Sequence, residues 1–286
     1  MARGQRIPRW ARPSLIVRIS ESKTTLAQYQ QALSAINIDS YAAGASALAL
    51  PQAVPVAQLP GYAEGLFSVQ DAAAQLAAPL LLQGLDVTQP LRLLDACAAP
   101  GGKTAHLLDW AAARGAHWSV TALEVDAARA ARIHENLRRL GLRAQVLVAD
   151  AAEPDSWWQQ AGGAPFDAIL LDAPCTASGI VRRHPDVRWL RREGDIAQLA
   201  AQQARLLEAL WPRLRAGGRL LYCTCSVFRA EGDEQVAAFL ARHSDARRMP
   251  SPGHLLPVPP PARGAVPDNA GGERDGFFYA LLRKPA

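Results

Sequence analysis

The sequence is poor in the features that mark disulfide-rich and membrane-spanning proteins. Its four cysteines, Cys97, Cys175, Cys223 and Cys225, are too few and too scattered to form a disulfide framework in 286 residues. No apolar run is long enough to span a bilayer, and the N-terminus has no apolar segment of the signal-peptide kind. We therefore expect a soluble, cytoplasmic protein with reduced thiols and no membrane segment.

Lysine is almost missing, so the positive charge comes from arginine. Lys23, Lys103 and Lys284 are the only lysines, and the formal net charge is +5. This mild excess permits a polyanionic partner such as RNA without requiring one. Arginines gather between residues 182 and 192, and their guanidinium groups suit phosphate recognition. An ordinary solvated surface remains the alternative for any one of them.

Short apolar runs alternate with amphipathic stretches from residue 91 onward, which is typical of a parallel sheet covered by helices on both faces. The expected strands span 91–96, 118–125, 144–150, 166–174, 219–226 and 276–284. The first expected helix begins in the loop at 95–108 and extends to about Arg114. Three further helices are expected at 126–141, 195–218 and 231–243. The Pro- and Gly-rich stretch 250–272 reads as a surface loop. The fold class is α/β: a doubly wound, mostly parallel, Rossmann-like sheet.

The first residues follow a different pattern, which predicts a small α+β subdomain over 1–65. Strands are expected at 15–20 and 47–51, a helix at 24–36, and a linker at 51–60. A helix over 69–82 then opens the catalytic domain, which spans 66–286.

A glycine-rich loop, DACAAPGGKTAHLL (95–108), lies between a strand and a helix. Cys97 stands where a phosphate-binding Walker A loop needs glycine, and the GxGxxG dinucleotide pattern is absent. The remaining candidate is a loop that binds S-adenosylmethionine. Asp95, Glu124 and Asp150 each lie near the end of a strand, and a carboxylate at Glu124 can accept two ribose hydroxyls. Each acid alone could be a helix or turn cap, but together they favour a nucleoside site.

Two cysteines are expected in the same cleft, because Cys175 and Cys225 follow successive strands of the sheet. Methylation of carbon 5 of a pyrimidine needs a thiolate that adds to carbon 6, and a base that then removes the carbon-5 proton. Asp172 is a candidate acid/base group, and the second thiol is another. From the residues alone, either cysteine could be the nucleophile. Cys97 and Cys223 read as small buried apolar residues, and no spacing predicts a metal site.

Taken together, the motifs resemble a known family, the RNA cytosine-C5 methyltransferases, in particular the bacterial RsmB/Sun type that acts on 16S ribosomal RNA. The resemblance runs from about residue 60 to the end. The stretches that carry it are VQDAAAQ (69–75), LDACAAPGGKTAHLL (94–108), NLRRLG (136–141), FDAILLDAPCTASGIVRRHPDVRWLRR (166–192), ALWPRLRAGG (209–218), LLYCTCSV (220–227) and DGFFYALLRK (275–284).

The resemblance implies a class I methyltransferase fold, S-adenosylmethionine as cofactor and RNA, in particular 16S rRNA, as partner. It assigns Cys225 as the nucleophile and Cys175 to release of the methylated base. Asp150 and Asp172 would contact the adenosine and the reacting centre, and Glu124 the ribose. The loop around the methionine part of the cofactor would be Cys97, Ala98, Ala99, Pro100, Gly101, Gly102 and Lys103. RNA would be contacted by Arg182, Arg183 and His184, and also by Lys103.

Several features differ from the family pattern. Full-length relatives carry a further helical, NusB-like RNA-binding domain ahead of the matching region, and this sequence begins after it. Glu124, Cys223 and Ser20 stand where relatives usually have Asp, Ala and Asn. The alternative functions are cytosine-C5 methylation of tRNA or another RNA, and a non-catalytic RNA-binding ribosome-assembly factor. DNA methylation, with Cys175 as nucleophile, is disfavoured by the TCS motif. We expect no metal, and a monomer.

Overall fold

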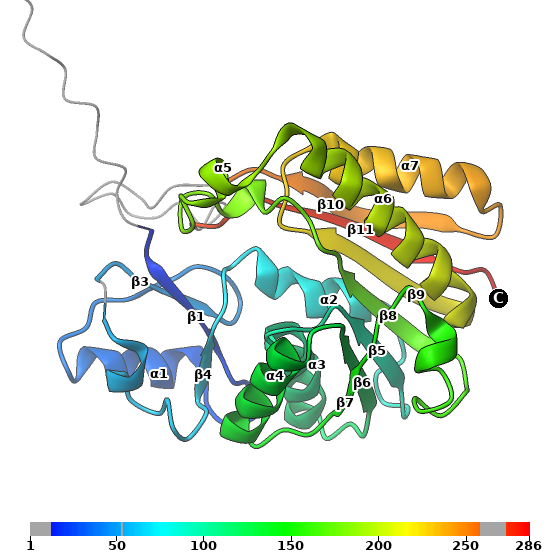
Figure 1. Cartoon of the computed structure of the whole chain (residues 1–286). Coiled ribbons are helices and arrows are strands. Elements are labelled where there is room, and N and C mark those ends of the chain that lie inside the picture. The colour runs from blue at the N-terminus through cyan, green and yellow to red at the C-terminus, as the bar shows by residue number, and fades with distance from the viewer. Residues whose placement is uncertain (1–12, 53, 258–272) are drawn as a thin grey trace, which may run out of the picture.

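The computed structural model describes residues 13–52, 54–257 and 273–286, which form two sheets (Figure 1). The larger sheet has seven strands in the order β10-β11-β9-β8-β5-β6-β7. The five strands from β9 to β7 are parallel, and β11 runs antiparallel to β9. The strand bounds are β5 Arg92–Ala96, β6 Ser119–Glu124, β7 Gln145–Val148, β8 Phe166–Asp172, β9 Leu214–Thr224, β10 Arg247–Leu255 and β11 Phe277–Arg283. This is the predicted doubly wound, mostly parallel sheet.

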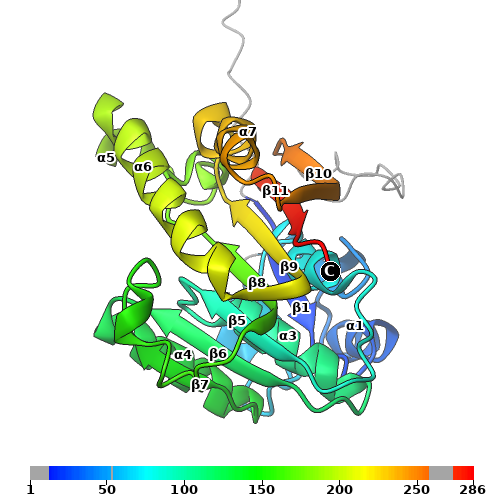
Figure 2. The same cartoon turned by 90° about the vertical axis from the view of Figure 1, so that its right-hand side faces the viewer.

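Helices cover both faces of this sheet, as the near-continuous apolar strands require. Successive strand residues point to opposite faces, so Ile169 packs with α6 (Glu193–Leu210) and α7 (Asp233–Arg242). Leu170 packs on the other face with α2 (Ala77–Leu82) and α3 (Gly102–Ala113). Helix α4 (Ala127–Leu140) lies beside α3 and against β6 and β7. Figure 2 shows the strands fanning from β7 to β10, with α6 and α7 on one side.

The N-terminal residues form a four-stranded antiparallel sheet of order β2-β3-β1-β4, packed against α1 (Leu26–Ser34). Its strands are β1 Leu15–Ile19, β2 Tyr41–Ala42, β3 Ala47–Leu50 and β4 Phe67–Val69. Because β4 pairs with β1, this sheet continues past residue 65. We therefore place the end of the subdomain after Val69.

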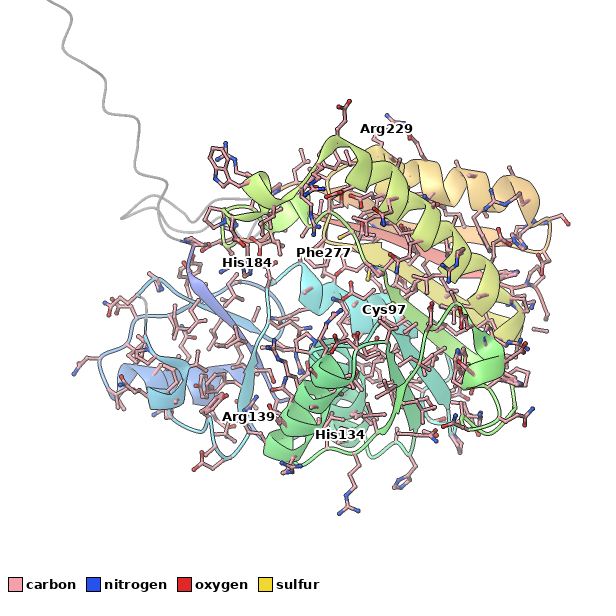
Figure 3. The ribbon with its side chains drawn as sticks, in the orientation of Figure 1. Cys97, His134, Arg139, His184, Arg229 and Phe277 are labelled. Carbon is pink, nitrogen blue, oxygen red and sulfur yellow. The ribbon has the colours of Figure 1, made fainter. Side chains whose placement is uncertain are left out.

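Buried polar contacts join this subdomain to the larger sheet and its helices. The Asp109 carboxylate of α3 lies 3.5 Å from the Arg18 guanidinium and accepts the hydroxyl of Ser20. Arg139 of α4 donates to the carbonyls of Tyr62 and Phe67, and Figure 3 shows it between α4 and the N-terminal sheet. The N-terminal sheet is therefore fixed against the two helices that follow β5 and β6.

Three expected elements differ from the structure. The helix predicted over 195–218 ends at Leu210, because Pro212 lacks an amide hydrogen and its ring opposes a further turn. The glycine pair at 217–218 instead lies within β9. The predicted helix over 69–82 begins with a 3₁₀ turn at 74–76 and is α-helical only from Ala77.

The third difference is at the Pro- and Gly-rich stretch, where residues 247–255 form strand β10 instead of a loop. This strand lies at the edge of the sheet and pairs with β11 alone. Prolines are tolerated at an edge because one side of the strand needs no hydrogen-bond donors. The part of the predicted loop from 258 to 272 lies outside the described residues.

Candidate active site

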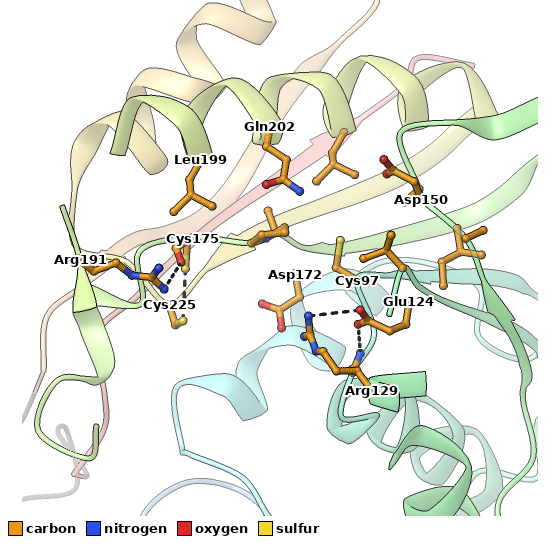
Figure 4. A pocket seen from close by; sticks show the side chains of 18 residues that line it. Cys97, Glu124, Arg129, Asp150, Asp172, Cys175, Arg191, Leu199, Gln202 and Cys225 are labelled. Carbon is orange, nitrogen blue, oxygen red and sulfur yellow. Dashed lines mark hydrogen bonds and ion pairs between the residues drawn. The ribbon is translucent and has the colours of Figure 1, made fainter. Parts of the chain in front are cut away.

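A cavity of about 430 Å³ opens at the carboxyl end of the parallel strands. Its walls come from the loops after β5, β6, β7, β8 and β9 and from one side of α6 (Figure 4). In a doubly wound sheet this edge is where ligands bind. Of the predicted site residues, the cavity is lined by Cys97, Ala99, Glu124, Asp150, Asp172, Cys175 and Cys225.

The predicted cofactor loop leaves β5 and enters α3 within a few residues. Gly101, the residue just before α3, has a φ of 92°, and a Cβ there would lie only 3.2 Å from the Ile133 backbone. Only glycine combines this backbone with such close helix packing. The loop is held by the amide of Ala98, which donates to the Leu123 carbonyl at 2.8 Å, and by Asn136, which donates to the Pro100 carbonyl at 2.7 Å.

The carboxylate of Glu124 is placed at the cavity by backbone donors. Its two oxygens accept the amides of Ala99 and Asp126, each at 3.2 Å, and Arg129 lies 3.3 Å away. The side chain is 2% exposed yet lines the cavity. Asp150 also lines it and is paired with Arg205 at 3.2 Å. Two carboxylates thus face one cavity at the ends of adjacent strands β6 and β7.

The third acid of the sequence pattern points elsewhere. Asp95 is fully buried on β5 and accepts the hydroxyl of Thr104 at 2.5 Å. Burial raises the pKa of Asp95 to about 7, and the Thr104 hydrogen bond opposes that shift. Among the described residues Asp95 is not part of the cavity lining. Its hydrogen bond to Thr104 connects β5 to the start of α3.

Lys103 and Asp172 form an ion pair between the loop and the end of β8. Lys103 Nζ lies 2.6 Å from an Asp172 oxygen and 5.4 Å from the Phe277 ring centroid. Burial opposes the charge on Lys103, but the Asp172 carboxylate outweighs it and raises the lysine pKa. Cys223 Sγ donates to the second Asp172 oxygen at 3.4 Å. Lys103 therefore carries a charge next to the predicted reacting centre and does not extend into solvent.

The two cysteines of the PC and TCS motifs meet at the other end of the cavity. Cys175 Sγ and Cys225 Sγ are 3.4 Å apart (Figure 4). The hydrogen bond to Cys225, together with burial, raises the pKa of Cys175 well above that of an ordinary thiol. Cys223, on β9 and two residues before Cys225, is fully buried, as predicted.

Arg182 and Arg183, predicted to contact RNA, turn their guanidinium groups toward buried carboxylates. Arg182 pairs with Asp275 at 2.6 Å and Glu273 at 2.8 Å, and Arg183 pairs with Asp275 at 2.7 Å. These ion pairs join the loop after β8 to the residues before β11. His184 is exposed (Figure 3). An RNA contact by these three residues stays a prediction.

The sequence did not predict several cavity residues, because they lie on α6 or just before it and not in the loops that follow the strands. Helix α6 supplies Leu199 and Gln202, and Arg191 donates to the Thr176 carbonyl at 2.8 Å. Glu231 does not line the cavity but binds the loops that carry both cysteines. The letters around Glu231, RAEGDE, read only as the start of a helix.

Within the described ranges, no group of three or more His, Cys, Asp or Glu side chains is arranged to hold a metal ion. In the same part of the chain, no helix combines the length and the apolar character needed to cross a membrane.

The sheet and its cavity define a Rossmann-like methyltransferase fold. A methyltransferase homolog protein from Pyrococcus horikoshii has the same fold, with a TM-score of 0.72 and 25% identity over 95% of this chain and 87% of that one. NSun6 from Pyrococcus horikoshii also shares it, with a TM-score of 0.75 and 18% identity over 97% of this chain and 92% of that one.

The chain belongs to the 16S rRNA methyltransferase RsmB/F family, whose model matches residues 82–283. It is 44% identical to ribosomal RNA small subunit methyltransferase B of Serratia proteamaculans (strain 568) over 96% of this chain. It is 49% identical to the protein of that name from Xanthomonas campestris pv. campestris over 84% of this chain. These matches cover 60% and 52% of the two relatives, so the chain spans little more than half of their length.

Proposed function

We propose that this protein transfers a methyl group from S-adenosylmethionine to carbon 5 of a cytosine in RNA, with small-subunit ribosomal RNA as the substrate. The observation that carries the proposal is the pair of thiols 3.4 Å apart at one end of a cavity that presents Glu124 and Asp150 at the other. The thiols suit addition to a pyrimidine, and the acids suit a nucleoside. The choice of RNA follows the names of the relatives.

The residues around the cavity fit S-adenosylmethionine. Glu124 has the carboxylate needed for two ribose hydroxyls, and Asp150 can meet the adenosine. The loop from Cys97 to Lys103 would surround the methionine part. When bound, the cofactor supplies an electrophilic methyl group.

The chain's own groups then account for the rest of the reaction. The Cys225 thiolate forms a bond to carbon 6, which makes carbon 5 nucleophilic. Asp172, held by Lys103, lies at the reacting centre and can hold or accept a proton. After methylation a base removes the carbon-5 proton, the sulfur–carbon bond breaks, and the thiolate leaves. The protonated Cys175 thiol beside Cys225 would assist this release.

The direct test is methyl transfer to RNA. The protein is incubated with S-adenosylmethionine carrying a labelled methyl group and with small-subunit ribosomal RNA, and the digested RNA is analysed by mass spectrometry. We expect labelled 5-methylcytosine. Label in tRNA but not in ribosomal RNA would change the substrate. RNA binding without label in any RNA would support a non-catalytic RNA-binding factor.

Replacing Glu124 with alanine is expected to weaken S-adenosylmethionine binding about 100-fold, because two hydrogen bonds of roughly 1–1.5 kcal/mol each are lost. Isothermal titration calorimetry measures the change. Glu124→Asp keeps the carboxylate and should stay within about threefold of the wild type. Equal affinities for wild type and Glu124→Ala would remove Glu124 from the cofactor site.

We expect the RNA to reach the cavity over the segment from α5 (Val187–Leu190) to Arg191. Trp189 is 88% exposed, and Arg191, two residues later, lines the cavity. An aromatic ring can stack on an unpaired base with a gain of about 1–3 kcal/mol. Trp189→Ala should therefore weaken binding of single-stranded RNA about tenfold and leave cofactor affinity unchanged.

Fluorescence anisotropy with a labelled RNA at fixed salt concentration checks this prediction. The matched control is Ile36→Ala, which removes another exposed apolar side chain just after α1 in the N-terminal subdomain. If both variants bind RNA like the wild type, the RNA does not cross α5.

A further inference from the structure

The carboxylate of Glu231 is buried beside the two cysteine loops and accepts hydrogen bonds from both. Glu231 lies in a 3₁₀ turn at 229–231 and is 0% exposed. One oxygen accepts the Thr176 amide at 2.8 Å and the Gln203 side chain at 3.3 Å. The other accepts the hydroxyls of Thr176 and Ser226, each at 2.6 Å. We call these four residues the Glu231 network.

The network connects the residues that directly follow the two cysteines. Thr176 follows Cys175 after β8, and Ser226 follows Cys225 after β9. The two strands run parallel, so their loops leave the sheet side by side. Beyond the strands, the Ala173 amide donates to the Cys223 carbonyl and the Gly179 amide to the Cys225 carbonyl, each at 2.9 Å. The Glu231 carboxylate adds a side-chain link at the residues that directly follow the two cysteines. One carboxylate that accepts from both loops can set the distance between their side chains.

The donors to Glu231 are all neutral. No Arg, Lys or His lies within ion-pair distance of it among the residues that the structure describes. Burying a carboxylate costs free energy unless hydrogen bonds compensate, and here four donors do so. A buried carboxylate that only fills space could be replaced by an apolar side chain. The Glu231 carboxylate instead accepts hydrogen bonds from two loops of the same cavity.

We propose that Glu231 is a positioning residue that holds the Cys175 and Cys225 loops so that their sulfur atoms are in contact. The roles of the two sulfurs, Cys225 as nucleophile and Cys175 as release group, rest on the proposed function; their placement by Glu231 does not. The placement itself can be measured without methyl transfer. Loss of the carboxylate is expected to let the two loops separate while the sheet and the cofactor loop stay intact.

The first measurement is thiol cross-linking with dibromobimane, in which each thiolate displaces one bromide and both sulfurs become joined through the reagent. Peptide mapping by mass spectrometry identifies the Cys175–Cys225 product. We expect rapid cross-linking in the wild type and at least about tenfold slower cross-linking in Glu231→Ala. The matched control Glu234→Ala changes an exposed acid of the neighbouring helix and should behave like the wild type.

Glu231→Gln separates geometry from charge. Its amide oxygen can still accept from Thr176, and the Thr176 and Ser226 hydroxyls can rotate to accept from the amide nitrogen. We expect cross-linking and kcat within about threefold of the wild type for Gln, and kcat about 100-fold lower for Ala. S-adenosylmethionine affinity should be unchanged in both, because a general loss of structure would also weaken cofactor binding.

Cross-linking in Glu231→Ala at the wild-type rate would overturn the proposal, as would a wild type whose two cysteines do not cross-link. Wild-type cross-linking that depends on Glu231, in a protein without methyl transfer, would retain the proposal and reject the proposed function instead. If Glu231→Ala does not fold, Thr176→Val and Ser226→Ala each remove one hydroxyl donor, and each should slow cross-linking in part. Wild-type rates in both would again overturn the proposal.

Discussion

Replacing Cys225 with alanine is expected to abolish both methyl transfer and the covalent bond to RNA. Without the thiolate, carbon 5 of cytosine stays a poor nucleophile, and the rate should fall by on the order of 10⁴-fold or more. The measurement uses RNA that contains 5-fluorocytosine, because fluorine cannot leave as the carbon-5 proton does and the adduct persists. A denaturing gel then separates free RNA from the protein–RNA adduct.

The control for this experiment is Cys223→Ala, near the end of the strand that precedes Cys225. Cys223 is fully buried two residues away, and alanine is common there in the family it resembles, so the adduct should still form. An adduct that persists in Cys225→Ala but is lost in Cys175→Ala would reverse the roles of the two thiols.

Replacing Cys175 with alanine is expected to have the opposite signature, an adduct that accumulates on ordinary cytosine. Cys175 is in contact with Cys225, and this hydrogen bond together with burial raises the pKa of Cys175. Its loss should therefore slow the release step and leave addition possible. Turnover should fall about 100-fold, the usual contribution of a positioned acid or base. Time courses of methylated RNA should show one rapid turnover followed by a stall, with protein bound to the RNA.

Cys175→Ser tests whether a proton donor alone is sufficient, because serine keeps a hydroxyl but ionises far less readily. Partial recovery of turnover would assign a proton-donating role to Cys175. Normal turnover in Cys175→Ala without adduct accumulation would contradict its role in release.

Residue types alone do not decide which of the two cysteines is the nucleophile and which assists release. Reasoning from residue types identified both Cys175 and Cys225 as strand-end cysteines but did not distinguish them. The family resemblance assigned Cys225 as nucleophile. The structure adds that the two sulfur atoms are in contact, 3.4 Å apart. It does not test which thiol attacks.

Local rules accounted for most elements and failed at particular residues. Helix α4 ends on Gly141 in a left-handed conformation, as the sequence predicts. Pro212 is a stop signal for α6 in the sequence, so a helix that extends to the glycine pair at 217–218 is too long. Strand β10 contains Pro250 and Pro252, which argue against a strand unless it lies at an edge. Its edge position is known only once the strand order is known.

The sequence by itself determined the alternation of strands and helices, the glycine loop, and which strand ends carry Glu124, Asp150 and the two cysteines. These features depend on near neighbours in the chain, where periodicity and backbone preference act. Only the tertiary structure decided that Arg182 and Arg183 bind carboxylates at 273–275, that Lys103 pairs with Asp172, and that Glu231 joins two loops. Each of these contacts joins residues from segments that are distant in the chain and that the sheet brings together. The partner of such a side chain is decided by which groups lie close to it in the folded protein and by the low dielectric of the interior, not by its neighbours in the chain.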